Sequence, residues 1–453
     1  MPGDMFPYNQ DNIVALATPP GIGALAIVRL SGTNLKKLYK SFTHKSPKNR
    51  FAAFTGLYHP VNNNLLDEAV VTYFMAPKSF TGEDMIEISC HGGNNVQNNI
   101  LRAAIESGVR LAEPGEFSFR SYMNGKMDLL QAEAVSSLIT SKSTLSTEIS
   151  LNHLKGKVSA TLQKIKSDIL DVLSLIENEL NFSEEEIELT SLEKIKDDVI
   201  CVRSKIQSIL ESSTFGKNIF SGIRVILLGK PNSGKSSLFN AILGYERTIV
   251  SSTPGTTRDT IEAWFELGGI PICLIDTAGV WESKEYLDSL GVEKTMDELK
   301  RADICIIVDE TNPEKLLRKN FKKHIKDHYV LVKSKIDLNS SSPPKSDNII
   351  STSVKKDKGL NKLLTSLSTC SQLIIGGKGN RLDQVLVTKR QRQLLENSMF
   401  FINESINQLD AGVETDIIAS TLRSFVISIS DVVGEIPNKD VMKNIFNSFC
   451  VGK

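Results

Sequence analysis

The chain has 453 residues, enough for about three domains, and equal numbers of basic (Lys and Arg) and acidic (Asp and Glu) residues, 53 of each. The formal net charge is zero, so the chain lacks the overall positive charge that would attract nucleic acid or an anionic membrane surface. A local basic patch is not excluded by this balance. The six cysteines form no CxxC pair, which argues against a disulfide framework and a zinc site. No apolar run approaches the ~18 residues of a membrane span, and residues 1–10 lack a signal-peptide pattern. These features predict a reducing, cytoplasmic location without membrane attachment.

Residues 1–120 are predicted to form an α+β domain. Short alternating runs at 24–30, 69–75 and 85–89 indicate strands, and the pattern at 94–107 indicates a helix.

Long helices are predicted for residues 121–215. Apolar residues recur there at spacings of three and four, the pattern of a helix packed in a bundle. They are Leu151, Leu154, Val158, Leu162, Ile165, Ile169, Val172 and Ile176. A further helix is predicted from Ile195 to about residue 215, and helical periodicity returns in residues 378–453 with Leu395, Met399, Ile402, Ile406 and Leu409.

An α/β domain is predicted between these helical segments, at residues 216–377. Its apolar runs at 223–228, 270–275, 304–308 and 329–332 are typical of a buried, mostly parallel sheet. Cys273 and Cys305 lie in such runs and are expected to be core residues. The order helix, α/β block, helix predicts that this domain is inserted into one helical domain.

The segment Gly229-Lys-Pro-Asn-Ser-Gly-Lys-Ser236 follows the first apolar run of this block and matches a phosphate-binding loop, here called the P-loop. Strand, glycine-rich loop and helix together direct backbone N–H groups at the phosphates of a nucleotide. Lys235 is expected to reach the β- and γ-phosphates, and the Ser236 hydroxyl to bind Mg²⁺. The predicted nucleotide contacts from this loop are Asn232, Ser233, Gly234, Lys235, Ser236 and Ser237.

Two further segments fit the switches of a GTPase. In residues 255–259, Thr256 is expected to contact the nucleotide and Thr257 to supply a second hydroxyl to Mg²⁺. In residues 276–279, Asp276 fits a carboxylate behind the Mg²⁺ ligands, and the Gly279 N–H fits a γ-phosphate contact. Thr277 and Ala278 complete this predicted contact segment.

Guanine selection is predicted to lie in residues 334–337. Asp337 can accept both the N1–H and the 2-amino hydrogens of guanine, which adenine does not offer. GTPases usually carry Asn where Ser334 stands, so guanine affinity is predicted to be weaker while specificity is retained. The predicted base contacts are Ser334, Lys335, Asp337, Ser353, Val354 and Lys355.

No glutamine follows residues 276–279 to position the attacking water. The amide oxygen of Asn232 can instead hold a monovalent cation beside the phosphates. Such a cation supplies the positive charge that an arginine finger provides elsewhere.

The chain resembles the MnmE/TrmE family, GTPases that modify the wobble uridine of certain tRNAs. The resemblance covers nearly the whole chain and rests on the P-loop domain together with residues 11–21, 80–84, 90–93, 113–117, 124–134 and 449–453. The last segment, Phe-Cys-Val-Gly-Lys, is close to the family's terminal Cys-Ile-Gly-Lys.

The resemblance implies a multidomain α+β and α/β protein. Residues 1–120 would be a folate-binding and dimerisation domain, 121–215 and 378–453 the two halves of a helical domain, and 216–377 an inserted Ras-like G domain. It also implies a homodimer that forms a heterotetramer with an FAD-dependent partner similar to MnmG/GidA. The implied reaction adds an aminomethyl or carboxymethylaminomethyl group to carbon 5 of the uracil. The one-carbon unit would come from a 5,10-methylene or 5-formyl tetrahydrofolate, and hydrolysis of GTP with Mg²⁺ would be stimulated by K⁺ and by contact between G domains.

The resemblance also implies several site residues. Folate contacts fall on Arg29, Glu87, Lys126 and Lys453. K⁺ contacts fall on Asn232, Ser251, Thr253 and Thr256. Cys450 matches the family's functional cysteine, and Asp288 stands where the family has its water-activating Glu.

The exchange of Glu for Asp retracts the carboxylate by more than an ångström, and misplacement of this size can cost about 10²-fold in rate. Asp288 and Ser334 together predict a slow or weakly binding GTPase.

Three alternatives stay open at this point, one of them a folate-dependent transferase in which the GTPase is incidental. A ribosome-assembly or translation GTPase would share the P-loop but needs neither the folate-type first domain nor the cysteine-containing end. A degenerate GTPase that acts only as a scaffold would show no GTP turnover in either KCl or NaCl.

Overall fold

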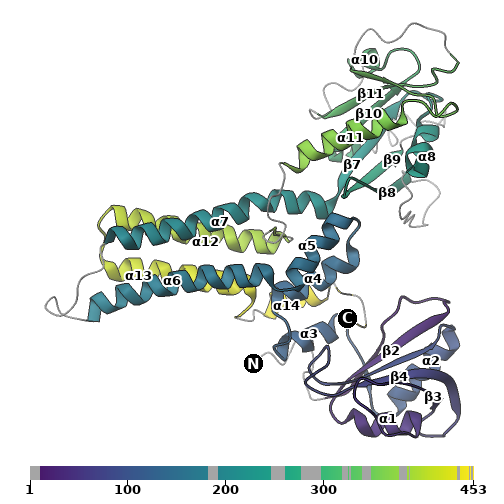
Figure 1. Ribbon diagram of the computed structural model, residues 1–453, viewed down its shortest axis with the longest axis vertical. Helices are drawn as coiled ribbons and strands as arrows, with labels where there is room; N and C mark the ends of the chain where they lie inside the picture. Colours follow the sequence, from purple (N-terminus) through teal and green to yellow (C-terminus); the bar gives the residue numbers. More distant parts are fainter. Residues whose placement is uncertain are drawn as a thin grey trace. The chain divides into compact units, whose positions relative to one another are not determined.

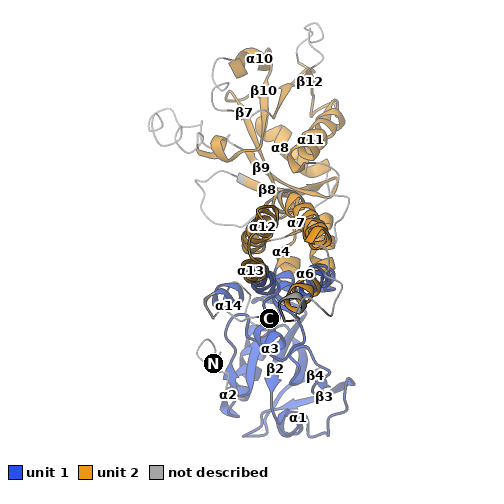
Figure 2. Cartoon of the chain, turned by 90° about the vertical axis from the view of Figure 1, so that its left-hand side faces the viewer, with its two compact units in different colours: residues 1–136, 154–170, 422–453 blue, residues 137–153, 171–421 orange. Residues whose placement is uncertain are grey.

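The computed structural model describes residues 11–181, 192–245, 261–276, 297–318, 325, 328–338, 348–376, 385–386, 388–435, 439–447, 449 and 452. The chain divides into two compact units (Figure 2). Unit 1 contains residues 1–136, 154–170 and 422–453, and unit 2 contains residues 137–153 and 171–421. Among the helices described, none combines the length and apolar character needed to cross a membrane.

Unit 1 is built on a six-stranded sheet with the order β3-β4-β5-β2-β1-β6, of which β2, β3 and β4 are labelled in Figure 1. All neighbouring strands are antiparallel except β1 and β6, which are parallel. The strands are β1 (Ile13–Leu16), β2 (Leu25–Gly32), β3 (Ala52–Tyr58), β4 (Leu65–Phe74), β5 (Asp84–His91) and β6 (Arg110–Leu111). The accompanying helices are α1 (Leu35–Thr43), α2 (Asn94–Glu106), α3 (Glu116–Met123) and, near the end of the chain, α14 (Lys439–Phe446).

Strand alternation determines which side chains of this sheet are available to a ligand. On β2, Ala26, Val28 and Leu30 are buried in the core together with Ile86 and Ile88 of β5. Successive side chains of a strand point to opposite faces, so Arg29 lies on the other face. There it is directly opposite Glu87 of β5.

Unit 2 contains the predicted α/β block. Its sheet has the order β12-β11-β10-β7-β9-β8, and only the pairing of β8 with β9 is antiparallel. The strands are β7 (Ile223–Gly229), β8 (Ile261–Leu267), β9 (Ile270–Asp276), β10 (Ile304–Asp309), β11 (Tyr329–Lys333) and β12 (Ile349–Ser351). The helices along this block are α8 (Lys235–Tyr245), α10 (Pro313–Leu316) and α11 (Leu360–Ile375). The predicted fold class, mixed α+β and α/β with a mostly parallel second sheet, is confirmed.

The remaining helices are long. They are α4 (Leu129–Thr140), α5 (Thr144–Leu154), α6 (Lys157–Asn181), α7 (Leu192–Ser221), α12 (Lys389–Asp410) and α13 (Thr415–Val433). Helix α7 runs six residues past the predicted end near residue 215, up to Gly222, whose φ of 72° belongs to the left-handed region.

The prediction of one buried apolar stripe over residues 151–176 is partly wrong. It is divided between two helices, because α5 ends at Leu154 and Gly156 adopts a φ of 74° before α6 begins. Leu151 is exposed rather than buried. From Val158 to Ile176 the stripe is buried as predicted.

Candidate functional site

The predicted phosphate-binding loop joins β7 to α8. Strand β7 lies between β9 and β10 in the sheet, so the loop leaves the carboxyl end of a central parallel strand, where ligands of open α/β sheets bind. Asn232 and Gly234 have φ values of 61° and 89°. Gly229 has no room for a side chain, because a Cβ there would lie 2.3 Å from the carbonyl oxygen of Val308.

Lys235, the first residue of α8, folds back over this loop. Its side chain is buried, and Nζ donates to the carbonyl oxygens of Gly229 at 3.1 Å and Lys230 at 2.9 Å. The ammonium is therefore held where the loop curls around it. A phosphate group carries more negative charge than a carbonyl oxygen, so it can replace these bonds favourably.

The predicted base-recognition segment is tied to the same loop. The buried Ser334 Oγ donates a 2.6 Å hydrogen bond to the carbonyl oxygen of Ser233. Lys335 Nζ donates to the carbonyl oxygen of Asn232 at 2.5 Å and to Glu310 Oε1 at 2.6 Å. Two consecutive residues thus hold two consecutive carbonyl oxygens of the P-loop.

Asp337 lies further along this segment, and its Oδ1 accepts a 2.6 Å hydrogen bond from Ser353 Oγ. The hydrogen bond from Ser353 holds the pKa of Asp337 below its ordinary value, and the charges of Lys355 and Lys356 act in the same direction. Asp337 is consequently an ionised hydrogen-bond acceptor at neutral pH. Ser353, Val354 and Lys355 follow β12 after the single residue Thr352, and the bond between Ser353 and Asp337 brings both predicted base-recognition segments together.

Asp276 ends β9 and is buried. Its Cα partner across the strands is Ile261, the first residue of β8. The other predicted switch residues lie outside the described part of the chain. They are Ser251, Thr253, Thr256, Thr257, Thr277, Ala278, Gly279 and Asp288.

Asp309 and Glu310, at the end of β10, were missed by the sequence analysis. Asp309 Oδ1 accepts hydrogen bonds from the N–H groups of Thr311 and Asn312, each at 2.8 Å, and Lys230 Nζ lies 3.6 Å from Oδ2. Burial alone would raise the pKa of Asp309, but these hydrogen bonds and the Lys230 charge lower it below its ordinary value. An acidic pair at the carboxyl end of a strand beside the P-loop strand is a signal that could have found it.

The predicted folate residues Arg29 and Glu87 contact each other in unit 1. Arg29 donates to Glu87 Oε1 from Nε at 2.9 Å and from Nη2 at 2.7 Å. Its third contact is a 3.1 Å bond from Nη1 to the carbonyl oxygen of Gly452. The guanidinium lies 5.8 Å from the ring centroid of Phe80 and 5.9 Å from that of Phe117.

Lys126 follows α3, and its side chain lies close to Gly82, in the loop before β5. Lys453 and Cys450 lie outside the described residues. Gly452, between them in the sequence, brings this end of the chain to Arg29.

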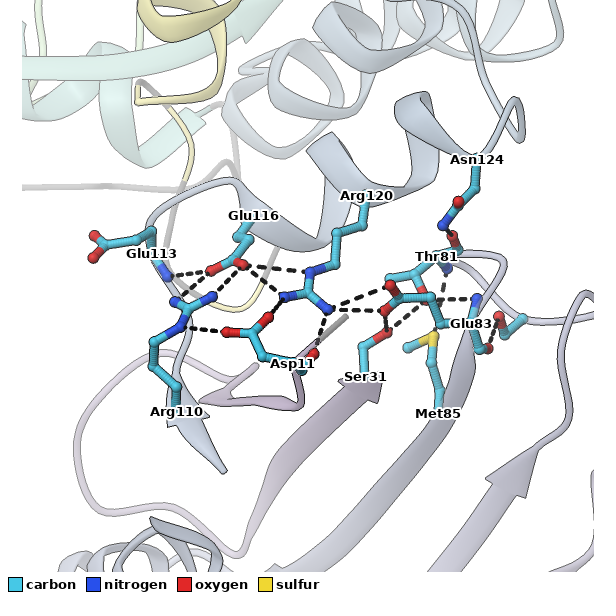
Figure 3. A network of polar contacts seen from close by, with 11 residues as sticks. Asp11, Ser31, Thr81, Glu83, Met85, Arg110, Glu113, Glu116, Arg120 and Asn124 are labelled. Atoms are coloured by element: carbon cyan, nitrogen blue, oxygen red, sulfur yellow. Dashed lines mark hydrogen bonds and ion pairs between the residues drawn. The ribbon is translucent and has the colours of Figure 1, made fainter. Parts of the chain in front are cut away.

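An ionic network is centred on the buried Arg120 and includes Asp11, Glu83, Arg110 and Glu116 (Figure 3). Arg120 of α3 is 1% exposed and bonds Asp11 Oδ1 at 2.6 Å, Glu116 Oε1 at 2.9 Å and Glu83 Oε2 at 3.1 Å. Arg110 binds Asp11 and Glu116 from the other side, each at 2.8 Å. Glu83 also accepts a 2.8 Å bond from Ser31 Oγ. The network therefore joins the start of β1, the loop before β5 and helix α3.

The cysteines of the two sheets are core residues, as predicted for Cys273 and Cys305. Burial, with a contribution from Asp67, raises the pKa of Cys90 to about 11. Burial, with the Glu262 charge, raises that of Cys273 to about 12. Neither is a thiolate at neutral pH. Within the described residues no group of three or more His, Cys, Asp and Glu side chains could hold a metal ion.

Comparisons with known proteins cover almost the whole chain. Residues 12–126 match the family model of the GTP-binding protein TrmE N-terminus, and residues 129–450 match that of the MnmE helical domain. The protein named tRNA modification GTPase MnmE from Aquifex aeolicus is 35% identical over 456 residues, which are 98% of this chain and 100% of that protein. Its namesake from a Thermotoga species is 36% identical over 464 residues, with the same coverage of 98% and 100%. A solved G domain of the T. maritima FeoB iron transporter is 29% identical and covers 33% of this chain and 99% of that one, with a TM-score of 0.27.

Proposed function

Because the chain belongs to the MnmE family, whose members carry the name tRNA modification GTPase, we propose that it hydrolyses GTP in the modification of tRNA. The finer proposal is that it adds an aminomethyl or carboxymethylaminomethyl group to carbon 5 of the wobble uridine. The observation that carries the GTPase part is the double tie of Ser334 and Lys335 to the P-loop.

In the proposed G domain, each described residue has a distinct task. Lys235 gives up its two loop carbonyl oxygens to bind phosphate, and Ser236 beside it offers a hydroxyl to Mg²⁺. Ser334 and Lys335 keep the loop in shape, and Asp337 selects guanine. When bound, Mg²⁺ neutralises the charge on the transferred phosphoryl group.

A K⁺ ion is proposed to add to this positive charge. Asn232 fits a K⁺ contact because its backbone, at a φ of 61°, is fixed through its carbonyl oxygen by Lys335. Its side chain is thus presented from a defined position. Ser251, Thr253 and Thr256 complete the proposed K⁺ site, and Asp288 is the proposed base for water.

The face of the first sheet that carries Arg29 and Glu87 is proposed to bind a tetrahydrofolate, either 5,10-methylene or 5-formyl. A cation suits the carboxylates of a folate, and a carboxylate suits the amino and N–H edge of its pterin. Both are present side by side here, with the rings of Phe80 and Phe117 beside them. Lys126, Lys453 and Cys450 are proposed to act at the same site.

Family membership also supports the remaining proposals. They are a homodimer, a heterotetramer with an FAD-dependent partner similar to MnmG, a cytoplasmic location, and a G domain at 216–377 inserted between helical segments 121–215 and 378–453 after a first domain at 1–120.

The proposed function is tested by nucleoside analysis of tRNA. Cells that lack the gene are complemented with the wild-type chain, with Lys235→Ala, or with Lys362→Ala, which changes an exposed lysine on α11. We expect the wild type and Lys362→Ala to restore the modified wobble uridine and Lys235→Ala to leave it unmodified. Unchanged wobble uridines in the deletion strain would refute the proposal.

A further inference from the structure

Two side chains of β8 contact the start of α5 and the loop before it; β8 and α5 are both labelled in Figure 1. The Glu266 carboxylate accepts the backbone N–H of Thr144 on Oε2 at 2.9 Å and the Thr144 hydroxyl on Oε1 at 2.8 Å. Two residues earlier on β8, the ring of Trp264 lies beneath Lys142, with Nζ 3.4 Å from the ring centroid. One strand thus caps the first residue of α5 with a carboxylate and contacts the preceding loop through a cation–π contact.

Helix α5 is attached to the nucleotide-binding sheet by more than this loop. Thr144 is its first residue, and a carboxylate is favoured at a helix N-terminus because the unpaired N–H groups there carry partial positive charge. Ile149 is fully buried within the hydrophobic core of the sheet, and Leu145 packs against that core. At the other end of α5, His153 Nε2 lies 2.6 Å from the carbonyl oxygen of Val385, another residue of this core.

Strand β8 also reaches the nucleotide site. Its first residue, Ile261, is the cross-strand partner of Asp276, the proposed carboxylate behind Mg²⁺. The Trp264 ring covers Gly222, where a Cβ would meet Cζ3 at 2.5 Å. Gly222 directly precedes β7, the strand that ends in the P-loop. Strand β8 therefore contacts both the surroundings of the proposed nucleotide site and the start of α5.

We propose that Glu266 is a positioning residue that links the nucleotide state of the G domain to helix α5. The contacts with Thr144 are exposed, where such interactions are weak enough to be rearranged without unfolding the helix. This inference rests on the proposed function, because it requires that the sheet binds GTP and GDP in different conformations.

The test compares amide hydrogen exchange of the full chain with GDP and with a non-hydrolysable GTP analogue, in KCl and MgCl₂. In the wild type, we expect the amides of residues 144–154 to exchange at different rates in the two states. The ratio of the faster to the slower of these two rates should be about two- to fivefold smaller in Glu266→Gln and in Thr144→Val than in the wild type. Glu262→Gln is the matched control, because Glu262 lies on the same strand but binds Arg224 within the sheet, and it should behave as the wild type.

Two results would overturn the link. One is equal exchange of the α5 amides in both states of the wild type, and the other is an undiminished ratio in Glu266→Gln and Thr144→Val. Binding of a fluorescent GTP analogue is measured on the same samples. If the wild type does not bind the GTP analogue, the proposed function and the link are both overturned. If it binds normally but the variants keep the wild-type ratio of exchange rates, only the link is overturned.

Discussion

Ser334 Oγ donates a 2.6 Å hydrogen bond to the carbonyl oxygen of Ser233 and so connects the base-recognition segment to the P-loop. Its hydroxyl is used for this tie, at a position where GTPases usually carry the longer Asn. Removing it leaves a buried carbonyl oxygen without this partner, which costs about 1–3 kcal/mol.

Ser334→Ala is therefore expected to weaken binding of GTP and GDP about tenfold or more, since 1.4 kcal/mol corresponds to a factor of ten. Isothermal titration calorimetry checks this. Ser204→Ala is the control, because the exposed Ser204 hydroxyl donates only within its own helix, at 3.0 Å to Ile200. An unchanged Kd for Ser334→Ala would show that the tie does not shape the loop.

Asp337→Asn is expected to change which base is bound. The ionised carboxylate is proposed to accept two hydrogens from guanine, and each such bond to a charged group contributes about 1.5–3 kcal/mol. An amide in its place donates instead, which suits the 2-oxo group of xanthine. GTP affinity should fall about 100-fold while xanthosine triphosphate gains, as measured by competition binding. Asp357→Asn, on the neighbouring loop, should leave both affinities unchanged; a retained preference for GTP in Asp337→Asn would assign base selection elsewhere.

Arg120→Ala is expected to destabilise unit 1 by about 3–5 kcal/mol, the usual cost of leaving buried charges unpaired. Three carboxylates depend on this guanidinium, and it is 1% exposed. Arg110 is 32% exposed in the same network, so Arg110→Ala should cost less. Differential scanning calorimetry of the full chain measures the destabilisation by each variant. Equal destabilisation by Arg110→Ala and Arg120→Ala would contradict the central role given to Arg120.

Asp11 is expected to make stability depend on pH in the acid range. Burial alone would raise its pKa, but the hydrogen bonds and charges of Arg110 and Arg120 outweigh burial and lower it from the ordinary 3.8. A lowered pKa means that the stabilisation is present above about pH 4 and is lost as pH falls through the lowered value. Asp11→Asn should therefore unfold more readily than the wild type at pH 5, and the difference should shrink at pH 3. A difference independent of pH would point to packing rather than charge.

Cys90 and Cys273 are expected to resist alkylation at pH 8 in the folded protein. Their pKa values are raised to about 11 and about 12 by burial, and the thiolate is the reactive form. Cys201 is exposed and should react first. Mass spectrometry after brief treatment with iodoacetamide separates the three sites. Early modification of Cys273 would show that the sheet opens readily.

The sequence predicted the parts of the fold that depend on local pattern. The four apolar runs of the α/β block became β7, β9, β10 and β11, because continuous apolar runs specify strands buried on both faces. Strand β8 was missed, since its alternation includes Glu262, Trp264 and Glu266 and its partner is a neighbouring hairpin strand. The two-residue turn Gly268-Gly269, through which β8 pairs with β9 as a hairpin, is a local signal that could have found it.

The site shows the same division. The P-loop residues and Asp337 follow from a motif whose spacing is dictated by phosphate and base geometry. The ties from Ser334 and Lys335 to the loop join residues more than 100 positions apart, and no local pattern reports such contacts. The pairing of Arg29 with Glu87 depends on the register of β2 against β5, which becomes visible only once the sheet is formed.

The bond from Arg29 to Gly452 spans 423 positions. During synthesis the strand that carries Arg29 is made early, and more than 400 further residues must follow before this partner exists. The six strands of the first sheet lie within residues 13–111, so they are made long before Gly452. A product that stops before Gly452 would therefore carry Arg29 without this carbonyl partner at the proposed folate site.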